Sequence, residues 1–416
     1  MRRSRIKFPT VLLRLLMTTS TAGKSLCDAL LEGLGSVPGT REFHVHVLQT
    51  LPRRNTSLYR YAQPRPKIYV QDVLVLLSES GGEEGKRVLV AGIEANVYHI
   101  PATSSAILYV CKVDSTGQSR GRSATKHMVE AFLRYYADPK TRPVSGVRHL
   151  WIQLFARAQG QYLFAESQAW EGKRPLRDVQ LCGWWKEVLG TVAKIDARIK
   201  AYYMLPGYSQ LEAEQMLKEA SSEMAWEYGH PYHVPELPCP RDSSEEGNHL
   251  GHTIPYFEDD PKSRFLDEMA LSTGRELRRP VRKRARTEKT VQETVHVTVD
   301  DFWERMSFRQ ECVTGAVTGF FTVVVVGKGE TVDREAEGHV TLAMHKRVRT
   351  ALTSSVSFAT AARAVQATET IERLCREVGC LSGVVAVQNG NSSGRGTEGG
   401  RGSNGVTLLA ARRKKK

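Results

Sequence analysis

The chain has 416 residues, 41% of them apolar, which suffices for one large domain or two ordinary ones. Its formal charge of +14 favours an acidic or polyanionic partner or a nuclear address. The seven cysteines contain no CxxC pair, which argues against a disulfide framework or a zinc ribbon and favours a reducing compartment. No apolar run approaches the ~20 residues that cross a bilayer, so no membrane partner is expected.

The N-terminus is basic and amphipathic over residues 1–16, as in a targeting segment, but Arg14 interrupts its short apolar core. Met17 opens a more ordinary start, so either Met1 or Met17 is the initiator. We expect residues 1–36 to be an N-terminal arm, with 1–16 a gene-prediction extension or a disordered segment.

Strands dominate the first part of the chain. Four segments are rich in β-branched and apolar residues: 42–50, 67–77, 87–95 and 105–113. Ser123 is expected to cap a helix whose apolar residues recur at helical spacing: Met128, Val129, Phe132, Leu133 and Tyr136. Residues 149–156 indicate another buried strand.

Helices follow. One long helix is predicted from the apolar series Leu181, Trp184, Trp185, Val188, Val192, Ile195 and Ile199. Ser209 and Glu212 have the spacing of a capping box that opens the next helix. Residues 227–252 are rich in Pro, His and Gly and are expected to form a structured loop, and a short helix follows Arg264.

The last part mixes both element types. Thr298 and Asp301 are expected to cap a helix, residues 314–326 are β-rich, and helical periodicity over 343–378 predicts at least one helix. The fold class is α/β (mixed α+β), a single large domain with disordered tails. The predicted segments are the arm 1–36, the domain 37–330 with a basic loop at 275–297, a helical segment 331–388 and a disordered Gly/Ser-rich basic tail 389–416.

Three motifs bear on ligand binding. Gly23-Lys24-Ser25 lacks the glycine five positions earlier that a P-loop requires. The His/Cys set in the Pro/Gly-rich loop has no CxxC partner, so no metal is expected from its members His230, His233, Cys239, His249 and His252. The basic run 278–286 fits a nuclear localisation signal or a polyanion-binding patch, and a solvated loop is the alternative.

The segment 255–265 (PYFEDDPKSRF) places two aspartates beside a proline. Neighbouring side chains of extended chain point in opposite directions, so Asp259 and Asp260 should have different roles. On local pattern, a charged surface turn that caps a helix near Ser263 is the alternative to a functional site.

Three further segments suit ligand binding. Residues 112–117 (KVDSTG), followed by 122–126, form a strand, a turn and a polar helix entry, where exposed amides favour phosphate, although an ordinary turn is the alternative. Residues 154–164 (LFARAQGQYLF) break a strand into a polar loop between aromatics. Trp184 and Trp185 lie about 100° apart on a helix, so one can pack inward while the other lines a groove.

Together, the segments 112–117, 154–164, 172–185 (GKRPLRD…WW) and 255–265 closely resemble the fungal histone H3 acetyltransferase family, the regulators of Ty-element transposition. The resemblance covers about residues 90–320. It implies a fold similar to CREB-binding-protein acetyltransferases, with a central, mostly antiparallel sheet of about seven strands wrapped by helices. It also implies acetyl-CoA as co-substrate, without a metal.

The resemblance assigns site residues. Trp185 and Asp260 would face the substrate lysine, Asp259 would support them, Tyr162 would lie near the acetyl group, and Lys262 would be autoacetylated. The coenzyme would be held by Val113, Asp114, Ser115, Arg122, Ser123, Ala124, Thr125, Lys126, Phe155, Gln159, Arg174, Pro175, Leu176 and Trp184. Gln159 and Arg174 differ from the smaller or imidazole side chains frequent in relatives, and residues 137–148 are short where some members carry a long basic insertion.

The resemblance further implies acetylation of newly made histone H3, at core lysine fifty-six and at tail lysines, in nucleosome assembly and the DNA damage response. The implied partners are H3–H4 and histone chaperones of the anti-silencing-function and nucleosome-assembly (Vps) types in the nucleus, with no sequence-specific DNA binding. Two alternatives stay open: a non-catalytic basic nuclear scaffold, and a coenzyme-A-dependent transferase with a small-molecule acceptor.

Overall fold

The computed structural model describes residues 24–81, 85–195, 197–220, 222–240, 250–272, 297–309, 317–327, 338–388 and 407–409. Outside these residues lie the predicted basic loop except for its last residue, most of the C-terminal tail, the arm up to residue 23, and His249.

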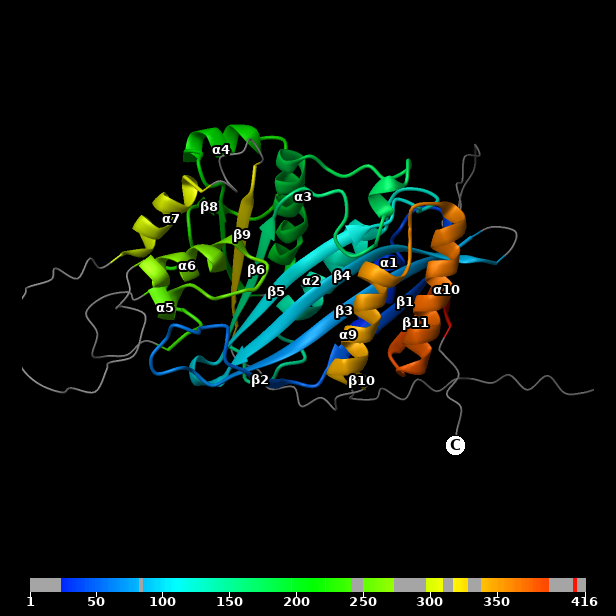
Figure 1. The fold of residues 1–416 in the computed structure, drawn as a ribbon, viewed down its shortest axis with the longest axis horizontal. Coiled ribbons are helices and arrows are strands. Elements are labelled where there is room, and N and C mark those ends of the chain that lie inside the picture. The colour runs from blue at the N-terminus through cyan, green and yellow to red at the C-terminus, as the bar shows by residue number, and fades with distance from the viewer. Residues whose placement is uncertain are drawn as a thin grey trace, which may run out of the picture.

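Along the described part of the chain, one α-helix precedes a run of five strands, and helices and strands are then intermixed (Figure 1). The strands are β1 (Thr40–Thr50), β2 (Arg53–Asn55), β3 (Ile68–Ser80), β4 (Arg87–Ile100), β5 (Ser105–Ser115), β6 (His149–Ala156), β7 (Arg198–Met204), β8 (Trp226–Tyr228), β9 (Gly319–Val326), β10 (His339–Val340), β11 (Leu381–Gln388) and β12 (Thr407–Leu409). The helices are α1 (Leu26–Leu34), α2 (Thr125–Ala137), α3 (Asp178–Gly190), α4 (Gln210–Met216), α5 (Leu250–Thr253), α6 (Pro261–Ser272), α7 (Val299–Ser307), α9 (Leu342–Thr350) and α10 (Ala361–Glu377).

The strands form one mixed sheet in the order β12-β11-β1-β3-β4-β5-β6-β9-β7-β8, with β10 beside β1 and β2 beside β3. Most pairs are antiparallel, but β5 and β6 run parallel, with Ser105 opposite His149. This confirms the predicted fold class. The sheet is larger than the seven strands expected, because described segments before and after the central part also pair with it.

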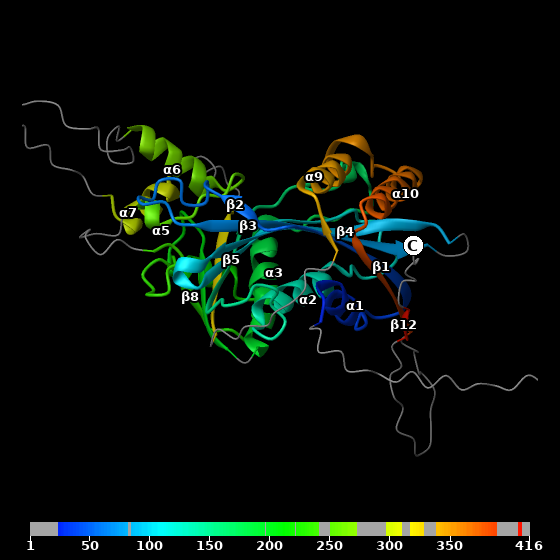
Figure 2. The ribbon, with the colours of Figure 1, turned by 90° about the horizontal axis from the view of Figure 1, so that it is seen from below.

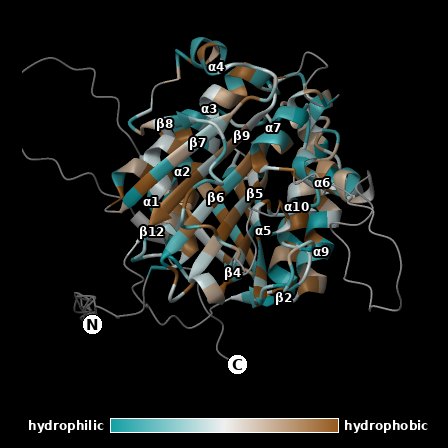
Figure 3. Ribbon diagram, turned by 90° about the vertical axis from the view of Figure 1, so that its left-hand side faces the viewer, coloured by the Kyte–Doolittle hydropathy of each residue, from teal (hydrophilic) through white to brown (hydrophobic). Residues whose placement is uncertain are grey.

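Helices cover both faces of the sheet (Figure 2). On one face, α1, α2 and α3 pack over Val45, Val47 and Val75, and on the other, α9 and α10 pack over Leu48 and Leu74. Because successive strand residues point to opposite faces, β1 and β3 supply apolar side chains to both layers. Toward the β8 end, α6 and α7 enclose a third apolar cluster with Trp151 and Phe257. The strands are accordingly largely hydrophobic in Figure 3, whereas the surface helices carry hydrophilic residues.

Three boundaries differ from the sequence prediction. Residues 26–34, placed in the arm, form α1, whose Leu30 and Leu34 are buried under α2 and β11. The long helix ends at Gly190, and Ile199 lies in β7, because its aromatic, apolar segment pairs with β9. The C-terminal helical segment also contains β10 and β11, and β11 pairs with the edge of β1.

Several predicted local signals are present in the structure. Ser209 and Glu212 form the expected capping box of α4, and Thr298 and Asp301 form that of α7. Ser123 precedes the actual N-cap of α2, which is Ala124. Among the described residues, no helix combines the length and apolar character that a membrane crossing requires.

Candidate active site

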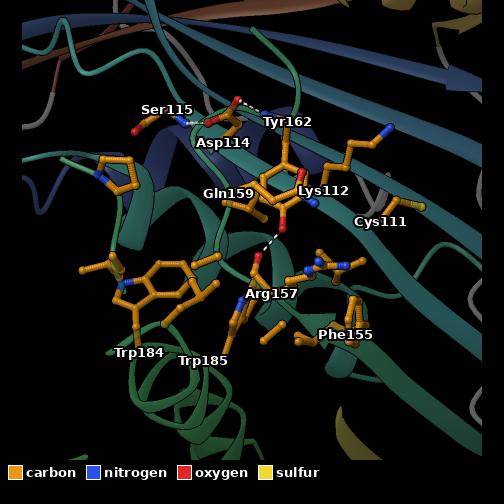
Figure 4. Close-up of a pocket in the computed structure, with 18 of the residues that line it drawn as sticks. Cys111, Lys112, Asp114, Ser115, Phe155, Arg157, Gln159, Tyr162, Trp184 and Trp185 are labelled. Carbon is orange, nitrogen blue, oxygen red and sulfur yellow. Dashed lines mark hydrogen bonds between the residues drawn. The ribbon is translucent and has the colours of Figure 1, made fainter. Parts of the chain in front are cut away.

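A cavity of about 610 Å³ opens where the parallel strands β5 and β6 end (Figure 4). The carboxyl ends of parallel strands meet at the same edge of a sheet, so the loops that follow β5 and β6 face each other there. The walls are completed by residues 173–176, by α3 and by the start of α6. All four sequence segments that carry the family resemblance therefore contribute to one cavity.

Asp114, near the end of β5, organises the wall formed by the loop after β6. Its carboxylate accepts hydrogen bonds from the backbone N–H groups of Tyr162 and Leu163, both at 2.8 Å. It also pairs with the Lys173 ammonium at 2.8 Å, and Lys173 in turn donates to the Ser167 hydroxyl. The carboxylate is thus already bound by groups of the protein itself, and its negative charge would repel a phosphate placed beside it.

The turn after β5 depends on Gly117, whose φ is +77°. A Cβ added there would lie 2.5 Å from Lys173 Cα, so only glycine allows the turn to approach the Lys173 backbone so closely. The Trp170 indole N–H donates to the Gly117 carbonyl and joins the same two segments.

Aromatic side chains line the cavity. Trp184 and Trp185 project from α3, with ring centroids 4.8 Å apart in an edge-to-face arrangement. Trp185 is only 5% exposed. Opposite them, the Tyr162 hydroxyl donates to the Arg157 carbonyl, as Figure 4 shows. Burial raises the pKa of Tyr162 to about 12, so this phenol stays protonated at neutral pH.

The cavity rim carries cationic and hydroxyl groups, most of them predicted. Ser123 and Thr125 lie at the start of α2, and Lys126 follows and pairs with Glu187 at 3.0 Å. On the opposite side, Arg174 donates to the Glu171 carbonyl, and the neighbouring Pro175 and Leu176 extend the wall. Backbone N–H groups and cations at a helix start favour an anionic ligand.

Asp259 and Asp260 lie in different environments, as expected for neighbouring side chains of extended chain. Asp259 lines the cavity, its side chain is 69% exposed, and it lies 3.9 Å from Lys112. Asp260 is fully buried behind the wall, where Oδ2 lies 3.1 Å from Lys262 Nζ and Oδ1 accepts the Lys262 backbone N–H. Asp260 directly precedes Pro261, the first residue of α6, so its carboxylate lies at the start of that helix.

Lys262 is itself buried, at 4% exposed. Its ammonium lies 5.0 Å from the ring centroid of Phe320 and 5.8 Å from that of Phe257. Burial lowers the pKa of Lys262, but the Asp260 carboxylate and Tyr232 outweigh that effect, so its pKa is raised overall. The structure therefore contains a charged lysine sealed against an aspartate just behind the cavity.

Tyr256, in the segment 255–265, contacts Asp267 and Arg60. Its hydroxyl donates to Asp267 at 2.8 Å, and its ring lies beneath the Arg60 guanidinium. Tyr109 stacks on Phe257 at 3.8 Å, and its pKa is raised by burial and by the charge of Asp260.

Most predicted site residues lie around the cavity. Those lining it are Val113, Asp114, Ser115, Ser123, Thr125, Lys126, Phe155, Gln159, Tyr162, Arg174, Pro175, Leu176, Trp184, Trp185 and Asp259. Those outside its lining are Arg122, Ala124, Asp260 and Lys262. Arg122 is exposed and its carbonyl accepts a hydrogen bond from Arg41, while Ala124 is buried at the start of α2.

Sequence reasoning missed other lining residues. Lys112, Arg157 and Arg264 add cations, and Lys173 supplies the buried partner of Asp114. Arg264 could have been found from its spacing. Residues three positions apart lie on one face of a helix, so Arg264 lies on the same face of α6 as Pro261, which also lines the cavity. Lys173 had none, since its partner lies 59 positions away along the chain.

The described histidines of the Pro/Gly-rich loop lie outside the cavity lining and contact Asp300, Cys239 and the Pro240 carbonyl. His230 Nε2 lies 2.9 Å from Asp300 Oδ1, and His233 approaches the same oxygen at 3.4 Å. His252 Nδ1 lies 3.7 Å from Cys239 Sγ and 3.1 Å from the Pro240 carbonyl.

Comparisons with known proteins identify the family and agree with the fold. The histone acetyltransferase KAT11-type domain matches residues 140–373. Histone acetyltransferase rtt109 of Aspergillus flavus is 30% identical over 273 residues, which are 58% of this chain and 46% of that protein. Histone acetyltransferase rtt109 of Schizosaccharomyces pombe is 25% identical over 256 residues, 58% of each chain.

The chain thus spans about half the length of the curated relatives that it matches. The crystal structure of Rtt109 from Aspergillus fumigatus has a TM-score of 0.70 and 22% identity, and the match covers 89% of this chain and all of that one. That likeness supports the fold, and the domain match, which spans more than half of the chain, establishes the family. The chain belongs to the KAT11-type histone acetyltransferase family.

Proposed function

We propose that this chain is an acetyl-CoA-dependent lysine acetyltransferase that acts on histone H3, and that the cavity between β5, β6 and α3 is its active site. The observation that carries the proposal is the convergence of four segments, distant in the sequence, on one cavity that has a cationic rim and an aromatic interior. Its volume of about 610 Å³ is in the range of small-molecule sites.

The rim residues suit the phosphates of coenzyme A. Arg174 and Lys126 supply positive charge on two sides, and Ser123 and Thr125 add hydroxyl groups at the start of α2. Asp114 acts in this proposal as a support of the loop rather than as a ligand, because Lys173 and backbone N–H groups already occupy its carboxylate.

The reaction requires a neutral lysine amine. A free lysine has a pKa of about 10.4, so a substrate lysine must lose a proton before its nitrogen attacks the thioester carbon. The new C–N bond replaces the C–S bond, and the thiolate of coenzyme A leaves and takes up a proton. Apolar walls such as Trp185 lower the pKa of an entering lysine, because burial disfavours its charged form.

Asp259 lines this space with an exposed carboxylate, whereas Asp114 is bonded to Lys173 and backbone N–H groups, so in our proposal Asp259 receives the proton, directly or through water. Asp260 is buried against Lys262 and acts as a positioning residue for the start of α6. If Lys262 is acetylated by the enzyme itself, its charge is lost and the Asp260 carboxylate is released toward the cavity wall. We expect a Lys262→Gln variant to be more active than Lys262→Arg or Lys262→Ala, and equal rates for the three would contradict this switch.

The finer assignments rest on the family resemblance. They comprise core lysine fifty-six and tail lysines of newly made H3, chaperones of the anti-silencing-function and nucleosome-assembly (Vps) types, action in the nucleus, and roles in nucleosome assembly and the DNA damage response. The formal charge of +14 is compatible with acidic chaperones as partners.

Peptide mapping by mass spectrometry tests the proposal. H3–H4 is incubated with the full chain and acetyl-CoA, with and without each chaperone, and acetylated lysines are located. Acetyl-CoA-dependent modification of H3 is expected. Binding of H3–H4 without any acetylated lysine would instead favour a nuclear scaffold, and transfer only to small amines would favour a small-molecule transferase.

A further inference from the structure

A second cluster of chemically reactive side chains lies outside the cavity. His46 is on β1, Cys375 is in the last turn of α10, and Cys380 immediately precedes β11. One ligand atom from each residue lies within 4.8 Å of the other two. None of the three lines the cavity, and our proposed acetyl transfer does not use them.

The cluster has the composition of a site for a soft divalent metal. Two thiolates and one neutral imidazole are typical ligands of zinc, and the two negative charges balance Zn²⁺. His46 is 7% exposed and Cys375 is fully buried, so a bound ion would be shielded from bulk solvent on that side, whereas Cys380 is partly exposed.

The distances require only a small adjustment. His46 Nδ1 lies 4.0 Å from Cys380 Sγ. A tetrahedral zinc ion, with bonds of about 2.3 Å to sulfur and about 2.0 Å to nitrogen, holds such a pair about 3.5 Å apart. A shift of a few tenths of an ångström in each side chain therefore brings these two atoms into ligand geometry.

A carboxylate orients the histidine in the way that metal sites commonly require. The other ring nitrogen of His46, Nε2, faces Glu372 Oε1 at 3.6 Å. Glu372 is buried and is fixed by the Ser78 hydroxyl, which donates to it at 2.6 Å, and by the Arg87 guanidinium. With the proton on Nε2 directed at Glu372, the Nδ1 lone pair points to the sulfur atoms.

We propose that His46, Cys375 and Cys380 bind zinc, with Glu372 as the carboxylate partner of His46 and water in the fourth position. On binding, both thiols lose their protons to solvent and form Zn–S bonds without any change of oxidation state. The ion would fasten the end of α10 and the start of β11 to β1, where β11 already pairs along the strand. The alternative is a Cys375–Cys380 disulfide, which would not explain the orientation of His46 toward the sulfurs.

Metal analysis of the full chain, purified under reducing conditions and exposed to Zn²⁺ and then dialysed, tests the proposal. We expect about one zinc per chain. Cys375→Ser and Cys380→Ser should lose it, whereas Cys182→Ala, which removes a buried cysteine of α3, should keep it. Zinc retained in both serine variants, or absent from the wild type, would overturn the assignment.

Co²⁺ titration of the wild-type chain avoids any dependence on variants that fold poorly. Thiolate-to-cobalt charge-transfer absorption should appear and should be abolished by added Zn²⁺. Chelation should also lower the Tm by a few degrees, about the change expected when a bound ion is removed, and Zn²⁺ should restore it. The absence of cobalt absorption by the fully reduced chain would contradict a metal site.

Discussion

The ammonium group of Lys173 lies 2.8 Å from the carboxylate of Asp114, and both side chains are only 5% exposed. This ion pair joins the end of β5 to the segment that continues into the Arg174 wall of the cavity. Because the pair is buried, removing either partner leaves an uncompensated charge and lowers the free energy of unfolding.

We therefore expect Asp114→Ala to lower the free energy of unfolding by about 3–5 kcal/mol. Lys173 and the backbone N–H groups of Tyr162 and Leu163 would lose their acceptor. The control is Lys194→Ala, which removes an exposed pair with Glu223 and should change the stability by less than about 1 kcal/mol. Urea denaturation measures both, and similar small losses for the two variants would show that the pair does not hold the loop.

Gly117→Ala and Gly146→Ala form a matched pair of variants. Both glycines have positive φ, +77° and +70°, so both substitutions strain the backbone by about 1 kcal/mol. Only at position 117 would the new methyl group collide with Lys173, because nothing lies within 4 Å of a Cβ at Gly146. Thermal unfolding should show a clearly larger loss of Tm for Gly117→Ala than for Gly146→Ala. Equal losses would mean that the Lys173 segment moves aside for the new methyl group without a measurable cost in stability.

Arg174→Ala should raise the KM for acetyl-CoA about tenfold with little change in kcat, because a phosphate contact contributes equally to the ground state and the transition state. Arg347→Ala removes an exposed arginine of α9 far from the cavity lining and should leave both constants unchanged. Steady-state kinetics at several salt concentrations provide the measurement. An effect on kcat alone would place Arg174 near the reacting atoms instead.

Asp260→Asn should lower stability by about 3–5 kcal/mol, because it leaves the Lys262 charge buried without its partner. The double variant Asp260→Asn/Lys262→Met should recover part of this loss. A double-mutant cycle measured by denaturation gives the coupling. Additive losses would indicate that the two groups do not interact.

If Asp260 only positions α6, kcat of the folded Asp260→Asn variant should fall by less than about tenfold. An acid–base residue typically contributes about 10²–10⁴ to the rate.

His99 gives a pH dependence of stability. Burial lowers the pKa of His99 below its ordinary value of 6.5, so the folded state resists its protonation. The stability that neutral His99 contributes is fully present above the pKa of His99 in the unfolded chain. It is lost as the pH falls through the lower pKa of His99 in the folded protein. We expect the stability difference between wild type and His99→Gln to decrease from pH 7.5 to pH 5, and a constant difference in urea denaturation would contradict this.

Local sequence patterns predicted much of the fold. Apolar, β-branched runs located the strands β1, β3, β4, β5 and β6, and the spacing of Ser209 and Glu212 located the start of α4. The pattern could not show that β11 pairs with β1, because that contact joins segments more than 300 residues apart. The spacing of Val192, Ile195 and Ile199 suits a helix, yet pairing with β9 makes Ile199 part of a strand.

The site was predictable to a similar degree. The four motifs identified most of the cavity lining, including the tryptophan pair of α3. Spacing alone did not show which of the two aspartates is buried, because the burial of Asp260 depends on its contact with Lys262 in the first turn of α6. The cluster of His46 with Cys375 and Cys380 was likewise invisible to spacing rules, because the histidine lies on another strand.

The most direct test of our account is the initial rate of acetyl transfer from labelled acetyl-CoA to H3–H4, with a chaperone present. Wild type and Arg347→Ala are compared with Trp185→Phe and Arg174→Ala at limiting acetyl-CoA. We predict robust transfer by the first two proteins and a loss of about tenfold or more in the cavity variants. No transfer by the wild type, or transfer that both cavity variants retain in full, would contradict the assignment of this cavity as an acetyltransferase site.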